Sequence, residues 1–377
     1  MNRLTAIGLA SLVAYGLLIG SKYAGFVSAA REDRAPVAQA PAPASPAPSQ
    51  VVAGGKGLHP LAPQPAAPMP APVPRMQPVR ASPTALEFRA SRDLKAFADN
   101  LFARRDTLTG DERYYLAKAL EECHFAASMN DDLAAYSARQ RRQFIAGLPV
   151  GDAGNAKRIA AYDAVDSSQR CLRFQGTKIA TRDIEDLYRS AAMQGDARAQ
   201  GRMVVAELST KLSTPRPDGA AQAQIQVDDF TRIVGLLESQ DPEAILIVGQ
   251  FLAQSAMANQ LRIGPTGEYP EPSAFLGAFS LVACDLGPDC ITLSPEIKLA
   301  CAHGGYCDAQ TFETLYQNFL ASPWAYSTAM RYRDIIYNAI NTHDWSLLGL
   351  QPKASYVPAN KSSYLQQKSY ASLFAAQ

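Results

Sequence analysis

Two stretches of sequence decide the fold of this chain: DIEDLYRSAAMQGDARAQGRMVVAEL (residues 183–208) and DDFTRIVGLLESQDPEAILIVGQFL (residues 228–252). In each of them, apolar residues at helical spacing flank a short polar turn, Gln194-Gly195-Asp196 in the first and Ser239-Gln240-Asp241 in the second. An aspartate before a helical run supplies an oxygen for the free amides of the first turn. Each stretch is therefore predicted to form an antiparallel helix pair.

The same pattern extends over most of the chain after residue 84. Leu116, Leu120, Cys123 and Ala127 share one helical face after the turn at Thr109-Gly110-Asp111, and alternating strand patterns are nearly absent. We therefore predict an all-α domain over residues 85–377. Its antiparallel helix pairs are expected to stack as an irregular α-α repeat.

The first helix pair resembles Sel1-like repeats, which are relatives of tetratricopeptide repeats. The resemblance rests on Leu187-Tyr188, Ala191-Ala192, Gly195-Asp196-Ala197 and Ala199-Gln200. It covers about 75 of the 377 residues, and the chain departs from the family after Gln200, where Gly201-Arg202-Met203 replaces the family's leucine-glycine pair. The resemblance implies a helical repeat architecture and a role in protein interaction.

The N-terminal 84 residues have a different composition. Residues 4–20 carry no charge, and 14 of the 26 prolines lie between Pro36 and Pro83. We predict a membrane segment within residues 1–30, which contacts the bilayer through residues 4–30. A disordered Pro/Ala-rich linker is expected over residues 31–84, because proline and alanine offer little surface with which to build a core.

The membrane segment has two interpretations. An uncharged run of 17 residues is at the short end of a transmembrane span, and Lys22 could extend it by snorkelling, so an uncleaved inner-membrane anchor is preferred. The alternative is a signal peptide cleaved after Ala29 or Ala30, which leaves a soluble periplasmic protein. The basic residues that follow the span favour the opposite orientation. The cysteines and the linker nevertheless favour a periplasmic domain.

Charge argues against nucleic acid as a partner. Residues 1–84 hold seven Lys or Arg and two acidic residues, so the remaining 293 hold 29 and 33, a net charge of −4. Binding to a phosphate backbone needs a basic face.

All six cysteines lie in the predicted domain: Cys123, Cys171, Cys284, Cys290, Cys301 and Cys307. An even number behind an export segment favours disulfides. The equal spacings favour Cys284–Cys290 and Cys301–Cys307, which leaves Cys123 with Cys171. The alternative pairs Cys284 with Cys301 and Cys290 with Cys307. A zinc site formed by these four cysteines with His303 is disfavoured, because the cysteine pairs are too widely spaced along the chain.

The stretch FLGAFSLVACDLGPDCITLSPEIKLACAHGGYC (residues 275–307) also resembles exported helical proteins of Gram-negative bacteria, through CDLGPDC and CAHGGYC. This resemblance implies no chemistry.

No motif predicts catalysis, a cofactor or a metal, and we assign no residue to such a site. His59 lies in the linker, and no serine or cysteine forms a known local signature beside His124, His303 or His343. His343 is expected to stabilise a helix C-terminus, and the adjacent acids Glu121-Glu122 are expected to form a solvated face. Glu238-Ser239 only faintly resembles the catalytic pair of lytic transglycosylases.

We therefore predict a non-enzymatic protein-interaction or scaffold module in the periplasm, tethered to the inner membrane, with a protein partner in the cell envelope. The alternatives are a cell-wall-directed hydrolase and a passive structural component of an envelope complex. A binding groove would be lined by aromatic residues, and the candidates are Tyr114, Tyr115, Tyr188 and Trp324.

Overall fold

A computed structural model describes residues 78–129, 132–213 and 225–350. Within these ranges the chain is helical and forms no strand, in agreement with the predicted all-α class; Ile263 and Glu268 form an isolated antiparallel bridge. The predicted membrane segment and most of the predicted linker lie outside the described residues. None of the helices in these three ranges is long and apolar enough to cross a membrane.

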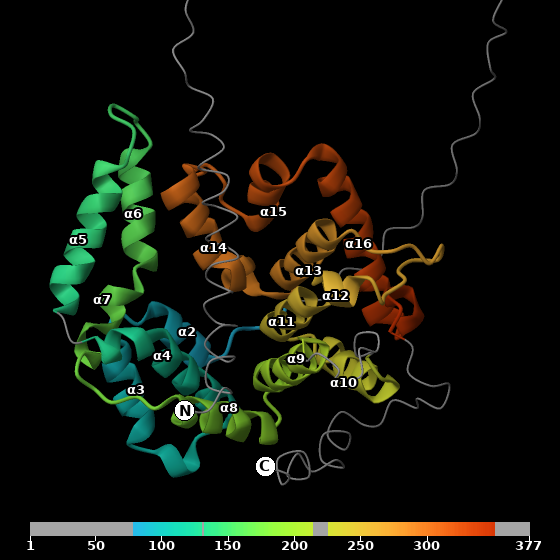
Figure 1. Ribbon diagram of the computed structural model, residues 1–377, viewed down its shortest axis with the longest axis horizontal. Helices are drawn as coiled ribbons and strands as arrows, with labels where there is room; N and C mark the ends of the chain where they lie inside the picture. Colours follow the sequence, from blue (N-terminus) through green and yellow to red (C-terminus); the bar gives the residue numbers. More distant parts are fainter. Residues whose placement is uncertain (1–77, 130–131, 214–224, 351–377) are drawn as a thin grey trace, which may run out of the picture. The chain divides into compact units, whose positions relative to one another are not determined.

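The first half of the described chain, drawn in blue and green in Figure 1, contains these elements: α2 (Pro83–Ala90), α3 (Leu94–Phe102), η1 (Arg105–Thr107), α4 (Gly110–Ser128), α5 (Leu133–Ala146), α6 (Asn155–Val165), α7 (Ser167–Cys171), η2 (Leu172–Phe174), α8 (Thr181–Met193) and α9 (Ala197–Ser213). Local signals set many of their starts. For example, Thr109 and Glu112 form a capping box at the start of α4.

The second half, drawn from yellow to red, contains α10 (Val227–Glu238), α11 (Pro242–Leu252), α12 (Ser255–Ala258), α13 (Pro272–Leu286), η3 (Pro288–Leu293), α14 (Ser294–Leu299), the π-helical turn η4 (Ala300–Gly304), α15 (Phe312–Leu315), the π-helical turn η5 (Tyr316–Leu320), α16 (Pro323–Thr342) and η6 (Trp345–Leu348). Proline stands in the first turn of α11, α13, α14 and α16, where it removes no helical hydrogen bond.

The long helices pack in a series of neighbours. Helix α4 packs on α8, α8 on α9, α9 on α11, α11 on α13, and α13 on α16. Two hydrophobic cores result. One is formed by α2–α4 and α8, and the other by α10–α13 and α16. Helix α9 belongs to both, because Ala199 lies in the first core while Val204 and Leu208 lie in the second.

The two predicted helix pairs have matching turns. Gly195 precedes Asp196 with a φ of +87°, and Gln240 precedes Asp241 with a φ of +55°. Each aspartate accepts hydrogen bonds from two amides of the following helix, at 3.1 and 3.0 Å for Asp196 and at 2.9 Å twice for Asp241. The two turns are thus built in the same way, 45 residues apart.

Helices α5 and α6 form a hairpin with a small buried surface. Only Leu133 and Ser137 of α5 are buried, and no residue of α6 is. The hairpin contacts the second half of the chain through Arg158, whose guanidinium donates to the carbonyls of Ala302 (2.9 Å) and His303 (3.1 Å). These bonds occupy carbonyls of η4 and fix the hairpin against it.

Candidate functional site

The structure places the six cysteines in three pairs at disulfide distance, Cys123–Cys171, Cys284–Cys290 and Cys301–Cys307. This is the pairing preferred from the sequence, and it engages the sulfurs considered as zinc ligands. Among the described residues, no group of three or more His, Cys, Asp or Glu is placed to hold a metal ion. Three disulfides indicate an oxidising compartment, as in the periplasm or outside the cell.

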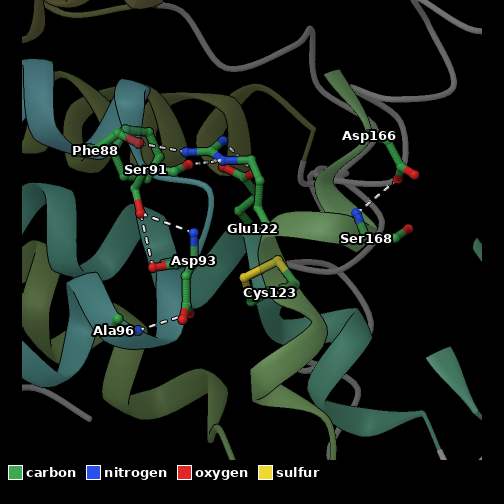
Figure 2. Close-up of a disulfide and its surroundings, with 10 residues drawn as sticks. Phe88, Ser91, Asp93, Ala96, Glu122, Cys123, Asp166 and Ser168 are labelled. Atoms are coloured by element: carbon green, nitrogen blue, oxygen red, sulfur yellow. Dashed lines mark hydrogen bonds and ion pairs between the residues drawn. A yellow bond between two sulfur atoms is a disulfide. The ribbon is translucent and has the colours of Figure 1, made fainter. Parts of the chain in front are cut away.

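The Cys123–Cys171 bridge joins α4 to α7 at the edge of the first core (Figure 2). The neighbouring Arg170 donates to the carbonyls of Phe88 (2.6 Å) and Ser91 (3.0 Å) and to Glu122 (2.7 Å). Its guanidinium also lies 5.1 Å from the centre of the Phe88 ring. Disulfide and arginine together hold the corner between α2 and α3 against α4, so this region is a structural joint.

A cluster of charged residues lies where α4, α9 and α11 meet. Glu243 lies in the first turn of α11. One of its carboxylate oxygens accepts a hydrogen bond from the Tyr114 hydroxyl (2.7 Å) and also forms an ion pair with Lys118. Its side chain is 13% exposed. Burial alone would raise the pKa of Glu243, but the charge and hydrogen bond of Lys118, with the Tyr114 hydroxyl, lower it to about 2. Glu243 is therefore ionised at neutral pH.

Arg198 and Arg202 extend this cluster along α9. Arg198 pairs with Asp196 and Asp111 and donates to the Tyr115 hydroxyl (3.0 Å). Burial lowers the pKa of Arg198, but the hydrogen bonds and charge of Asp196 outweigh this effect and raise it, so the guanidinium stays charged. Arg202 pairs with Glu121, which also accepts a hydrogen bond from Tyr188 (2.8 Å). These contacts join helices through satisfied ion pairs.

A second buried carboxylate near this cluster has a raised pKa, whereas the pKa of Glu243 is lowered. Burial raises the pKa of Glu296 on α14, and the negative charge of Glu243 adds to the effect while Lys118 opposes it. One oxygen of Glu243 and one of Glu296 are buried without a hydrogen-bond partner among the residues that the structure describes. The principal contacts of the cluster are ion pairs that connect α4, α9 and α11, so its main role is to link the two cores.

An open groove lies on the first core, between α3, α4 and α8. It has a volume of about 540 Å³, and a second recess of about 380 Å³ shares Phe102, Arg105, Arg113 and Leu187 with it. Apolar side chains form its floor: Phe102, Leu120, Phe174, Ile179 and Leu187. Its rim carries charges of both signs: Lys95, Asp99, Arg105, Arg113, Lys178, Asp183 and Asp186.

Part of this floor is accessible to solvent. Phe102, at the end of α3, is 43% exposed. On the rim, Lys95 pairs with Asp99 at 2.5 Å and Arg189 pairs with Asp186 at 2.7 Å, whereas Lys178 has no ion-pair partner among the described residues. A volume in this range is typical of ligand sites. The geometry fits contact with a side chain or short segment of another molecule.

Three of the four aromatic residues expected in a groove are buried instead. Tyr114, Tyr115 and Tyr188 are 1%, 1% and 5% exposed, and their hydroxyls bond to the charged cluster. The prediction that they line a groove was wrong, because the tyrosine side chains of α4 and α8 pack into the first core. Trp324 is 63% exposed at the start of α16.

The adjacent acids Glu121 and Glu122 point in different directions, as expected, but they do not form a solvated face. Each is paired with an arginine, Glu121 with Arg202 and Glu122 with Arg170, and their side chains are only 20% and 23% exposed. The partners lie 48 residues or more away in the sequence, so spacing within α4 could not indicate them.

The histidines lie on separate elements. His124 is in α4, and its buried Nδ1 has no hydrogen-bond partner among the described residues. His303 is in η4 and makes T-shaped contacts with the Phe144 and Tyr162 rings. Burial and the charge of Arg158 lower the pKa of His303. His343 ends α16 in a left-handed conformation, and its Nδ1 lies 3.2 Å from Glu238. Ser239 donates to the carbonyl of Leu236 (2.6 Å), so Glu238 and Ser239 both serve helix ends. His59 lies outside the described residues.

The groove was not found from the sequence. Its floor comes from α3, α4, η2, α8 and the loop before α8. The spacing of Phe102 and Leu187 in the chain gives no sign that both line it. Comparison with protein-family models, with curated proteins and with solved structures found no match to this chain.

Proposed function

We propose that this chain is a non-enzymatic protein-binding or scaffold module of the bacterial periplasm, tethered to the inner membrane by its N-terminal segment. The described helices act as a stacked array of antiparallel pairs that presents a groove to a partner in the cell envelope. The groove between α3, α4 and α8 carries this proposal, because it joins an apolar floor, exposed at Phe102, to a charged rim.

The construction of the helix pairs supports the array. In each of the turns Gly195-Asp196 and Gln240-Asp241, a residue in the left-handed conformation is followed by an aspartate that caps the next helix. Helix α9 completes one core and begins the next. In repeat proteins each unit buries its apolar face on its neighbour, and the resulting surface serves for binding.

The chemistry of the groove favours a polypeptide partner. Its rim holds four basic residues and three acidic ones, so it offers no single-sign field for a polyanion. Phe102 and Leu187 line both the groove and the adjoining recess and provide apolar contact. An apolar area surrounded by a polar rim is typical of protein interfaces.

The location rests on two features that agree. Three cysteine pairs indicate an oxidising compartment, and the uncharged run of residues 4–20 precedes a Pro/Ala-rich spacer.

The test is affinity purification of the full-length chain from chemically cross-linked envelopes. Leu187→Glu and Phe102→Glu place a charge in the groove, and we expect each to lower recovery of the specific partner at least tenfold. Phe125→Glu is the matched control, because Phe125 is 65% exposed on α4 and is not part of the groove. Equal recovery of all partners by the wild type and both groove variants would overturn the proposal.

A further inference from the structure

A second surface lies at the corner between η5 and α16. It exposes four apolar residues within six positions, which we call the tryptophan corner: Phe319, Leu320, Pro323 and Trp324. Phe319 is 38% exposed, Leu320 41% and Trp324 63%. Ser322 caps α16 by accepting from the amide of Ala325 (3.2 Å), and Pro323 fixes the first helical position. The backbone of Trp324 is therefore held in the first turn of α16.

The tryptophan corner lies in a stretch without charge. Residues 314–330 contain no Lys, Arg, Asp or Glu, although 19% of the whole chain is charged. Two amide side chains, Gln317 and Asn318, are exposed beside it and have no hydrogen-bond partner among the described residues. The Phe319 ring stacks on Tyr306 with centroids 4.6 Å apart. A ligand at the tryptophan corner would therefore contact aromatic rings and the amide groups of Gln317 and Asn318.

These groups select against several ligands. An anionic membrane surface or a nucleic acid is attracted by Lys and Arg, which residues 314–330 lack. A highly charged protein would find no side chain within residues 314–330 with which to form an ion pair. A neutral pyranose chain fits better, because its C–H faces stack on an aromatic ring while its hydroxyl and acetamido groups form hydrogen bonds with amides.

We propose that the tryptophan corner binds a neutral glycan strand of the cell wall that bears acetamido groups. Trp324 stacks on a sugar ring, Phe319 contacts the neighbouring ring, and Gln317 and Asn318 bond to acetamido and hydroxyl groups. The corner would hold the domain to the wall while the groove between α3, α4 and α8 binds a protein. None of the four residues of the corner lines the groove, so the two surfaces are separate. Figure 1 shows α3 and α8 in the lower part of the coloured helices and α15 in the upper part.

The chain provides its own optical probe. It has two tryptophans, and Trp345 is buried at 3% exposure, so Trp324 dominates any change in solvent contact. We would titrate the full-length protein in detergent with chitotetraose, four β-1,4-linked N-acetylglucosamine units. A saturable shift of tryptophan emission to shorter wavelength is expected as the sugar covers Trp324.

Calorimetric titration and co-sedimentation with purified cell-wall sacculi extend the test to variants without the probe. Trp324→Ala should weaken binding at least tenfold, Trp324→Phe only a few-fold, and Phe125→Ala not at all. Because Trp324 is exposed, each variant should keep the melting temperature of the wild type. Leu187→Glu should bind sugar normally, which separates failure of this proposal from failure of the groove.

Two results would overturn the glycan proposal. One is the absence of saturable binding to chitotetraose and sacculi, and the other is unchanged binding by Trp324→Ala. If Trp324→Ala binds sugar normally but loses a cross-linked envelope protein, the corner docks a protein and the glycan proposal is wrong.

Discussion

The guanidinium of Arg333 in α16 binds the carboxylate of Asp285 in α13 through two hydrogen bonds, Nε–Oδ2 at 2.7 Å and Nη2–Oδ1 at 2.6 Å. The side chain of Arg333 is only 2% exposed. Tyr337 donates to the same carboxylate. This pair fixes how the last long helix packs on the second core.

Removal of one partner of this pair should be strongly destabilising. Arg333→Met leaves the Asp285 carboxylate without its cation, and we expect a loss of about 3 kcal/mol or more in the free energy of unfolding, measured by urea denaturation. Arg141→Met is the control, because the Arg141–Asp163 pair has the same two-bond geometry but side chains 43% and 42% exposed. The control should lose less than about 1 kcal/mol. Equal losses would show that burial does not set the strength of the Arg333 pair.

The matching turns predict opposite effects of exchanging their left-handed residues. Gly195→Ala should destabilise the domain by about 1 to 2 kcal/mol, because a Cβ is disfavoured at a φ of +87°. Gln240→Gly should stabilise it by up to about 1 kcal/mol, since relief at a φ of +55° exceeds the added freedom of the unfolded chain. Thermal unfolding of both variants checks this. A stabilising Gly195→Ala would contradict the shared turn.

Acid should weaken the link between the two cores through Glu243. Its pKa is about 2 in the folded state and 4.5 as its ordinary value, so its contribution is complete above pH 4.5 and is lost as the pH falls toward 2. The difference corresponds to about 3 kcal/mol. Glu243→Gln should remove this part of the pH dependence, so its unfolding free energy should approach that of the wild type at pH 3. Parallel curves from pH 7 to pH 3 would refute the lowered pKa.

The disulfides should differ in their contribution to stability. Cys123 and Cys171 lie 48 residues apart and Cys301 and Cys307 lie 6 apart. On loop entropy, the double variant Cys123→Ala/Cys171→Ala should lose about 4 kcal/mol and Cys301→Ala/Cys307→Ala about 2 kcal/mol. Calorimetric unfolding measures both. Six free thiols in protein taken from the periplasm without reductant would disprove all three pairs.

The sequence predicted the features that are local. Helical periodicity, Gly195, and the capping residues Asp196 and Asp241 act within a few positions, and the helices begin and end where these residues indicate. The two cysteine pairs predicted from equal spacing, Cys284–Cys290 and Cys301–Cys307, are also local, since each spans only 6 positions.

The long-range contacts could not be predicted in this way. Arg170 reaches Phe88 across 82 residues, and Arg198 reaches Asp111 across 87. The burial of Tyr114 could not be predicted for the same reason, because its partner Glu243 lies 129 positions away. The groove is a further case, since its concavity arises only when α3, α4 and α8 have packed.

Site-specific photo-crosslinking in living cells would test directly whether the groove between α3, α4 and α8 contacts a protein of the envelope. A photoreactive amino acid would replace Leu187 in the groove of the full-length chain, and in a second strain it would replace Val150, which is fully exposed in the loop between α5 and α6. We predict that illumination yields a discrete cross-linked envelope protein from position 187 and none from position 150. The absence of any adduct from position 187, or the same adducts from both positions, would contradict the account.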